Sequence, residues 1–233
     1  MDSMKFLTSP RLAAIKGLVH GFGQRVPGAR EVARQAARDA WRAVGSAFFL
    51  RQVHGCAIAT PPWNDPPEAD ASVTGHEGHL LAIETADCLP ILIVDPVQKR
   101  VAAAHAGWRG SAARVAVEAV NRLIAMGSDP RRLLASLGPA IGPCCYEVGP
   151  EVEEAFGAQG AAFFKQGPSV RKHLDVVAAN RAQLEESGVR SANIDSLDLC
   201  TRCREDLFFS YRRDGANAGR MISVVGFSRA SQL

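Results

Sequence analysis

The stretch VAAAHAGWRG, residues 101–110, joins a run of small apolar residues to a histidine and then to a glycine-bounded turn. The apolar run indicates a strand that packs tightly on both faces. His105 ends this strand, and Gly107 and Gly110 allow the following backbone to bend and to approach a ligand closely. An imidazole, an indole and a guanidinium therefore meet on one turn, which can hold a metal, an aromatic ring and a phosphate. The alternative is a well-packed turn with an exposed arginine.

The rest of the chain alternates apolar runs with helical patterns and contains no evident linker, which predicts a single α/β domain over residues 1–233. The expected strands are 48–55, 79–85, 89–96, 100–107 and 221–228, and residues 133–149 are expected to be a strand that leads into a Gly/Pro-rich loop. The expected helices are 30–44, 111–126, 150–159 and 175–188. Ser111 is the expected N-cap of the helix that follows the turn.

Composition excludes several classes of partner. The 27 basic and 24 acidic residues leave a formal net charge of +3, which gives no electrostatic case for binding nucleic acid. The longest fully apolar run, residues 89–94, is too short to span a membrane, and residues 1–17 lack the apolar core of a signal peptide. We therefore expect a cytoplasmic protein whose six cysteines are thiols or metal ligands.

Three metal-ligating side chains share one feature of position. His54, Cys88 and His105 each lie at or just beyond the end of an expected strand. If these strands are neighbours in one sheet, the side chains converge at one edge. Two imidazoles and a thiolate are an accepted zinc ligand set, and three protein ligands leave a fourth position open, as in catalytic sites. The alternative is a set of unrelated residues, because the spacings match no local zinc motif.

The pair Cys200 and Cys203, in CTRC, is the best rival metal site. It needs a second pair of ligands, and Cys144 and Cys145 are adjacent, so they chelate one tetrahedral ion awkwardly. We therefore expect no structural zinc there. A redox dithiol also has weak support, because no strand leads directly through the motif into a helix.

Several long blocks occur in one order from about residue 48 to the C-terminus: RQVHG, ADASVT, TADCLPILI, AAAHAGWRG, LGPAIGPCCYEVG and FFSYRRDGANAGRMISVVG. Together they resemble the YfiH/laccase-domain family of purine nucleoside phosphorylases, once called multicopper polyphenol oxidases. The chain departs from the family pattern after His20, where the loop is shortened. If that loop closes over substrate, selectivity differs here.

The resemblance implies a zinc enzyme that phosphorolyses adenosine, inosine, guanosine and methylthioadenosine and that deaminates adenosine. The zinc ligands of the family fall on His54, Cys88 and His105. The implied fold is a mixed-sheet α/β sandwich shared with a group of bacterial cysteine hydrolases. Purine nucleosides and inorganic phosphate are the implied partners, with no nucleic acid and no membrane, and we expect a monomer or a weak homodimer.

The remaining candidate site residues are charged or aromatic side chains in or near these motifs. We expect Cys88, His105 and Asp87 to be catalytic. The candidate substrate-binding residues include Arg51, Arg109 and Arg212 as phosphate clamps, and Trp108 and Tyr146 as stacking partners of the purine. Glu84 is a further candidate substrate-binding residue. Glu84 and Asp87 are each a candidate proton carrier or partner of a ligand histidine.

Three alternatives stay open. A copper oxidase also uses two histidines and a cysteine, but its trinuclear centre needs more imidazoles than six histidines supply, so copper is the less favoured metal. A metal-free hydrolase would use Cys88 as nucleophile and His105 as base. A binding module that retains a relic of the site is disfavoured by the polar residues of HAGWRG and SYRRDG, because polar groups near a pocket are costly to retain.

Overall fold

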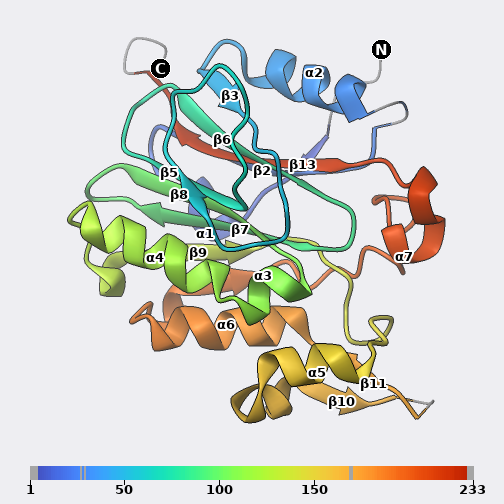
Figure 1. Ribbon diagram of the computed structural model, residues 1–233. Coiled ribbons are helices and arrows are strands. Elements are labelled where there is room, and N and C mark those ends of the chain that lie inside the picture. The colour runs from blue at the N-terminus through green and yellow to red at the C-terminus, as the bar shows by residue number, and fades with distance from the viewer. Residues whose placement is uncertain (1–4, 27, 29, 168–169, 230–233) are drawn as a thin grey trace.

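The computed structural model describes residues 5–26, 28, 30–167 and 170–229, and these form two mixed β-sheets packed face to face (Figure 1). The five-stranded sheet has, in spatial order, β1 (Phe6–Leu7), β2 (Leu18–Gly23), β13 (Met221–Phe227), β6 (His79–Thr85) and β3 (Ser46–Phe48). The six-stranded sheet has β12 (Ile194–Ser196), β9 (Leu134–Leu137), β7 (Leu89–Asp95), β8 (Arg100–Ala106), β5 (Ala71–Thr74) and β4 (Ile58–Ala59). The expectation of a mixed-sheet α/β sandwich is confirmed.

Strand β8 explains why the layers pack as they do. Its side chains alternate between two cores: Val101 and Ala103 face the other sheet, whereas Ala102 and Ala104 face the helical layer. All four are essentially inaccessible to solvent. A run of small residues therefore occupies a strand that is covered on both sides, as the sequence predicts.

Helices cover the outer face of each sheet (Figure 1). Helix α2 (Arg30–Trp41) packs on the five-stranded sheet through Ala33 and Ala37. Helices α4 (Val115–Ala125) and α6 (Val176–Glu186) pack on the six-stranded sheet. The remaining elements are α1 (Pro10–Ala13), α3 (Trp108–Ala112), α5 (Pro150–Phe156), α7 (Tyr211–Asp214), the hairpin β10 (Phe164–Gln166) with β11 (Lys172–Leu174), and 3-10 turns at Pro130–Arg132, Ala158–Phe163, Ser191–Asn193 and Gly215–Asn217.

The helix expected over 111–126 is two helices. Helix α3 begins three residues earlier, after Gly107, and Arg114 adopts a left-handed conformation (φ 63°) that separates α3 from α4. Ser111 is not an N-cap but a buried residue of α3, whose hydroxyl accepts a hydrogen bond from Asn180. Gln183 donates to the Ser111 carbonyl. Helix α6 thus holds α3 at the break through two side-chain hydrogen bonds to Ser111.

Two further expectations are corrected. The strand expected over 48–55 ends at Phe48, because residues 49–55 leave the sheet and are held by other contacts described below. The strands near the candidate ligands also do not share one sheet: β6 lies in one sheet and β7 in the other, so residues 86–88 cross between them. The shortened loop after His20 includes positions 27 and 29, which lie outside the described residues.

Among the described residues, no helix combines the length and the apolar character that crossing a bilayer requires.

Gly138 marks a close approach of the two sheets and provides a test of their packing. A Cβ at this position would overlap the ring of Phe22, which is fully buried, and would press on Pro90. We expect Gly138→Ala to lower the free energy of unfolding by about 1–3 kcal/mol, the usual effect of overpacking a core. Urea unfolding measures the change. Gly75→Ala is the control, since a Cβ there makes only ordinary contacts with Arg100 and Met126, and equal stability of both variants would contradict this account.

Candidate metal centre and its cavity

Asp70 organises the candidate metal centre, although it was not among the residues expected from the sequence. Its carboxylate, which is fully buried, accepts hydrogen bonds from the backbone N–H groups of Val53 (3.1 Å), His54 (2.9 Å) and Gly55 (2.6 Å). It also contacts Nδ1 of His105 at 2.8 Å. One carboxylate therefore holds both the loop of the first histidine and the ring of the second.

His54 lies on this loop in a left-handed conformation (φ 64°), which is unusual for a residue other than glycine. The N–H contacts to Asp70 stabilise that conformation. A second anchor lies close by, because the Gln52 side chain exchanges hydrogen bonds with the backbone of Glu84 (2.8 and 2.9 Å). Backbone strain of this kind is retained where the surroundings determine it, and such positions cluster at functional sites.

Two adjacent strands, β7 and β8, bring Cys88 and His105 together. Cys88 ends the crossing between the sheets and directly precedes β7, and His105 lies near the end of β8. The β7–β8 register pairs Leu89 with Ala106 and Pro90 with His105, so Cys88 lies opposite the end of β8. Hydrogen-bonded pairing of the two strands thus fixes the distance between the thiol and the imidazole.

The three donor side chains converge. Their ligand atoms all lie within 4.8 Å of one another, and the rings of His54 and His105 meet edge to face with centroids 4.8 Å apart. Burial raises the pKa of the Cys88 thiol, but the charge of His105 and hydrogen bonds with both histidines outweigh it and lower that pKa to about 6. Burial lowers the pKa of His105, but the Cys88 thiolate and Asp70 raise it to about 9. The cluster without a metal therefore favours a Cys88 thiolate paired with a protonated His105, and a bound metal ion would take the place of the proton on His105.

Gly107 leaves the space that this cluster occupies. A Cβ there would lie 2.9 Å from Cys88 Sγ and 3.1 Å from the His54 ring. The backbone of Gly107 has φ −72°, which any residue adopts, so the requirement for glycine is steric rather than conformational. A thiolate and two imidazoles with room around them and one ring oriented by a carboxylate match the ligand set and the outer hydrogen bonding of a zinc site.

The centre lies in the wall of a cavity of about 760 Å³, a volume typical of small-molecule sites. Nine of the ten candidate residues line it: His54, Glu84, Asp87, Cys88, His105, Trp108, Arg109, Tyr146 and Arg212. The exception is Arg51, whose exposed side chain lies outside the cavity and pairs with Glu68 at 3.4 Å. Arg51 therefore lies outside the cavity that Arg109 and Arg212 line.

Two guanidinium groups lie over aromatic rings in the cavity. Arg109 covers Trp108 at 4.3 Å from the ring centroid, and Arg212 covers Tyr146 at 5.3 Å. Arg212 also donates to the carbonyl of Glu147 (2.7 Å). Burial raises the pKa of Tyr146, so its hydroxyl remains a hydrogen-bond donor. The cavity therefore presents positive charge and flat apolar surface together.

Two carboxylates of the cavity wall already have partners. Glu84 is bound by Arg30 and Arg34 of α2, and these arginines lower its pKa against the opposing effect of burial. Asp87 accepts from the hydroxyls of Thr201 (2.6 Å) and Ser210 (3.0 Å) and from the Arg212 N–H (2.7 Å). Neither is the partner of a ligand histidine, a role that Asp70 fills instead.

Several cavity residues were not expected from the sequence, notably Arg30, Gln52, Arg171 and Arg220. Arg30 begins a helix that the sequence places far from the motifs, and only the fold brings it to Glu84. Asp70 lies within ADASVT, one of the motif blocks, but the motif alone does not indicate that its carboxylate contacts His105.

Comparisons with known proteins agree with the resemblance that the motifs indicate. A family model described as multi-copper polyphenol oxidoreductase laccase matches residues 24–228. A purine nucleoside phosphorylase of Deinococcus radiodurans is 41% identical over 181 residues, which cover 77% of this chain and 70% of that protein. Adenosine deaminase RL5, from an unknown prokaryotic organism, is 40% identical over 193 residues, which cover 75% and 72%. The solved structure of hypothetical protein YfiH from Bacillus licheniformis has a TM-score of 0.86 and 27% identity, with 97% of each chain covered.

We expect Asp70→Asn to lower zinc affinity about 10- to 100-fold, the usual effect of removing a carboxylate that orients a ligand histidine. Zinc titration against a competing chelator measures the affinity. Asp95→Asn is the matched control, because Asp95 is also buried and accepts two backbone N–H groups, at the far end of β7. Equal zinc affinities of the two variants would remove Asp70 from the metal centre.

Proposed function

The chain belongs to the multi-copper polyphenol oxidoreductase laccase family, and on this premise we propose that it is a zinc-dependent purine nucleoside phosphorylase that also deaminates adenosine. The observation that carries the proposal is the group His54, Cys88 and His105, which offers three ligands beside a cavity of nucleoside size. The names of the relatives support the two activities.

His54, Cys88 and His105 would hold the metal, with Asp70 orienting His105. When bound, Zn²⁺ would supply Lewis acidity and would lower the pKa of a coordinated water to about 7. The protein contributes the ligand spacing, the orientation of the ring and a partly enclosed cavity. Three protein ligands leave room for a further ligand, which suits catalysis better than a purely structural role.

Arg109 and Arg212 are the proposed phosphate-binding residues, because both line the cavity and a guanidinium binds phosphate in a bidentate manner. Phosphorolysis forms a bond from a phosphate oxygen to C1′ of the ribose and breaks the bond from C1′ to N9 of the purine. The products are ribose 1-phosphate and the free base, which takes up a proton. Trp108 and Tyr146 would contact the purine with ring surface that the two guanidinium groups leave free.

Deamination needs no phosphate. Water adds at C6 of adenine, ammonia leaves and inosine remains. This second activity uses the same cavity but makes no demand on an anion clamp, so the two reactions depend differently on Arg109 and Arg212.

Asp87 retains its proposed place in the catalytic group, with a role that its contacts define. Its carboxylate already accepts three hydrogen bonds, one of them from the backbone of Arg212. We propose that it positions Arg212 and the adjoining loop at the cavity. Glu84 would act in the same way through Arg30, which also lines the cavity.

The copper oxidase alternative needs a second group of metal ligands rich in imidazole. Among the described residues, the only other group of three or more potential metal ligands consists of four cysteines. Of the remaining histidines, His20 is buried and accepts the Ser9 N–H, and His173 contacts the Pro143 carbonyl. His76 and His79 lie beside each other, with ring centroids 5.3 Å apart, but within the described ranges no third ligand joins them. A trinuclear copper centre therefore has no ligand set in the part of the chain that the structure describes.

A metal-free cysteine hydrolase is the second candidate function. Cys88, His105 and Asp70 form a thiol–imidazole–carboxylate series like that of cysteine proteases, which favours this alternative. We also propose that the fold is related to that of the bacterial cysteine hydrolases. We further propose that residues 1–233 form one catalytic domain and that the protein is cytoplasmic. Activity that persists in metal-depleted protein and is lost when Cys88 is alkylated would favour the hydrolase, whereas the zinc enzyme loses its activity on metal depletion alone.

We expect Cys88→Ala to abolish nucleoside turnover and to remove zinc from the catalytic site. The assay incubates adenosine with and without phosphate and separates the products by chromatography. Adenine formed only with phosphate reports phosphorolysis, and inosine reports deamination. Cys56→Ala is the control, because Cys56 is a half-buried thiol two positions from His54 and outside both metal-ligand groups. Full turnover by Cys88→Ala would remove the proposed site.

We expect Arg109→Lys and Arg212→Lys to raise KM for phosphate about 10- to 100-fold, which corresponds to the loss of a hydrogen bond to a charged group. Deamination measured without phosphate should change much less. Arg51→Lys serves as the matched control outside the cavity. If the two cavity variants impaired both reactions equally, the arginines would act on the nucleoside or on the fold rather than on phosphate.

A further inference from the structure

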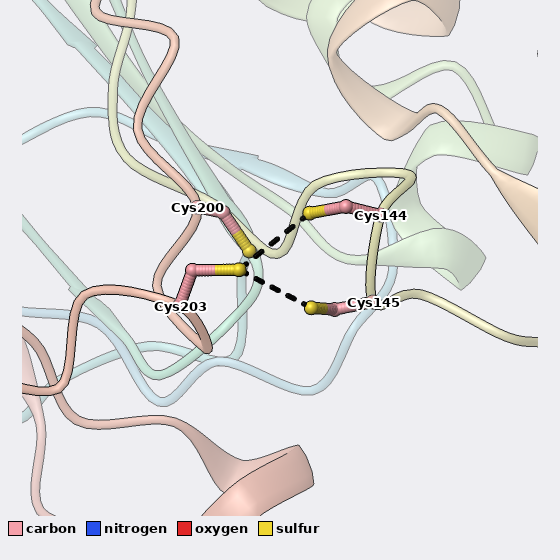
Figure 2. A group of neighbouring side chains, drawn as sticks. All are labelled: Cys144, Cys145, Cys200 and Cys203. Carbon is pink, nitrogen blue, oxygen red and sulfur yellow. Dashed lines mark hydrogen bonds between the residues drawn. The ribbon is translucent and has the colours of Figure 1, made fainter.

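Four of the six cysteines meet in a second cluster, away from the catalytic centre. Cys144, Cys145, Cys200 and Cys203 place their sulfur atoms within 4.8 Å of one another. Figure 2 shows the side chains of two loops pointing toward one another, with one pair on each loop. The adjacent pair Cys144 and Cys145, expected from the sequence to chelate one tetrahedral ion awkwardly, therefore lies close enough to Cys200 and Cys203 for the four sulfur atoms to form one group.

The sheet brings the two pairs together. Strands β9 and β12 are parallel neighbours, and their extensions continue side by side, with a bridge between Ala140 and Cys200. The Thr201 N–H donates to the Ala140 carbonyl at 3.0 Å, and the Ala140 N–H donates to the Leu199 carbonyl at 3.2 Å. Because parallel strands end at the same edge, pairs that are distant in sequence arrive at one place.

A tight turn solves the problem of the adjacent cysteines. The N–H groups of Cys145 and Tyr146 both donate to the Gly142 carbonyl, at 2.9 and 3.0 Å, so the chain reverses through Cys144 and Cys145. Both thiols thereby face the CTRC loop (Figure 2). Gly142 lies beneath them, and a Cβ there would come within 3.3 Å of Cys144 Sγ and 3.6 Å of Cys200 Sγ.

The sulfur spacing suits a tetrahedral ion. With Zn–S bonds of about 2.3 Å, tetrahedral geometry separates sulfur atoms by about 3.8 Å. Cys203 Sγ lies 3.7 Å from Cys144 Sγ and 3.4 Å from Cys145 Sγ. These distances need only small adjustments to admit the ion. Two of the four thiols, Cys144 and Cys203, are exposed, so an ion can reach the cluster from solvent.

Nearby donors offset the negative charge of the thiolates. The Gly142 N–H donates to Cys200 Sγ at 3.3 Å, and Arg202 Nη1 lies 3.6 Å from Cys145 Sγ. Four thiolates around Zn²⁺ carry a formal charge of −2, which a guanidinium and a backbone N–H stabilise.

We propose that Cys144, Cys145, Cys200 and Cys203 bind a structural zinc ion that joins these two loops. Four protein ligands close the coordination sphere, so this ion has no catalytic position, in contrast to the three-ligand centre. The proposal does not depend on the proposed function. The joined loops also carry cavity components, since Tyr146 follows Cys145 and Thr201 donates to Asp87.

Metal analysis of the full chain, purified under reducing conditions, tests the proposal. We expect about two zinc ions per wild-type chain, about one in Cys88→Ala, about one in Cys203→Ser and none in the double variant, since each group binds one ion. X-ray absorption of Cys88→Ala should show four sulfur ligands at about 2.3 Å. Cys56→Ser should retain the wild-type content. We expect Cys203→Ser to lower Tm by more than about 5 °C, because metal binding stabilises the native state.

Several results would overturn the proposal: Cys88→Ala without zinc, iron or copper in place of zinc, or a disulfide among the four cysteines in the mass of the non-reduced protein. If Cys203→Ser does not fold, the absorption spectrum of Cys88→Ala decides the matter alone. One zinc per wild-type chain, kept in Cys88→Ala and lost in Cys203→Ser, would support the four-cysteine site while contradicting the zinc-dependent catalytic centre. The two proposals therefore fail separately.

Discussion

A carboxylate removed from water is stable in its charged form only when hydrogen bonds replace its hydration, and Asp70 meets this requirement completely. Three consecutive backbone N–H groups and the His105 ring satisfy it. The same contacts hold His54 in a left-handed conformation and set the orientation of the second imidazole. The arrangement of the metal centre thus follows from the need to satisfy one buried charge, and the loop between β3 and β4 takes its path from that need.

The parts of the fold that were predictable from the sequence are those that local patterns determine. The apolar runs of β6, β7, β8 and β13 and the spacing of Val115, Ala119 and Leu123 in α4 marked elements whose burial the structure confirms. The break at Arg114 was not predictable from the helical spacing, and the side chain of Gln183 that donates to Ser111 beside it comes from a helix distant in sequence. Asp70 was missed for a similar reason: its partners include His105, 35 positions away. Arg51 pairs with Glu68 outside the cavity, because proximity to His54 in sequence does not determine where a long side chain points.

Two groups of metal ligands differ in how the fold assembles them. The His54, Cys88 and His105 group draws on a loop, a crossing and a strand, and it adjoins the large cavity. The four cysteines come from two turns that continue a parallel strand pair, next to Tyr146, which lines the cavity, and Thr201, which donates to Asp87 of the cavity wall. One chain thus combines an accessible, incomplete ligand set with a complete one. The three-ligand group, with a coordination position left open, suits catalysis, whereas the four cysteines suit a structural ion that holds two loops together.

The crossing at residues 86–88 belongs to neither sheet, yet it places Cys88 against His105 of one sheet and follows directly from β6 of the other. The position of the Cys88 thiol therefore depends on the distance between the two sheets. Side chains in the layer between the sheets, such as Phe22 and Leu92, set that distance. Substitutions in this layer are consequently constrained by ligand geometry as well as by stability, whereas substitutions beneath α2 on the outer face do not act on the spacing of the metal ligands. Divergent relatives should accordingly vary more in their outer layers than in the inner one.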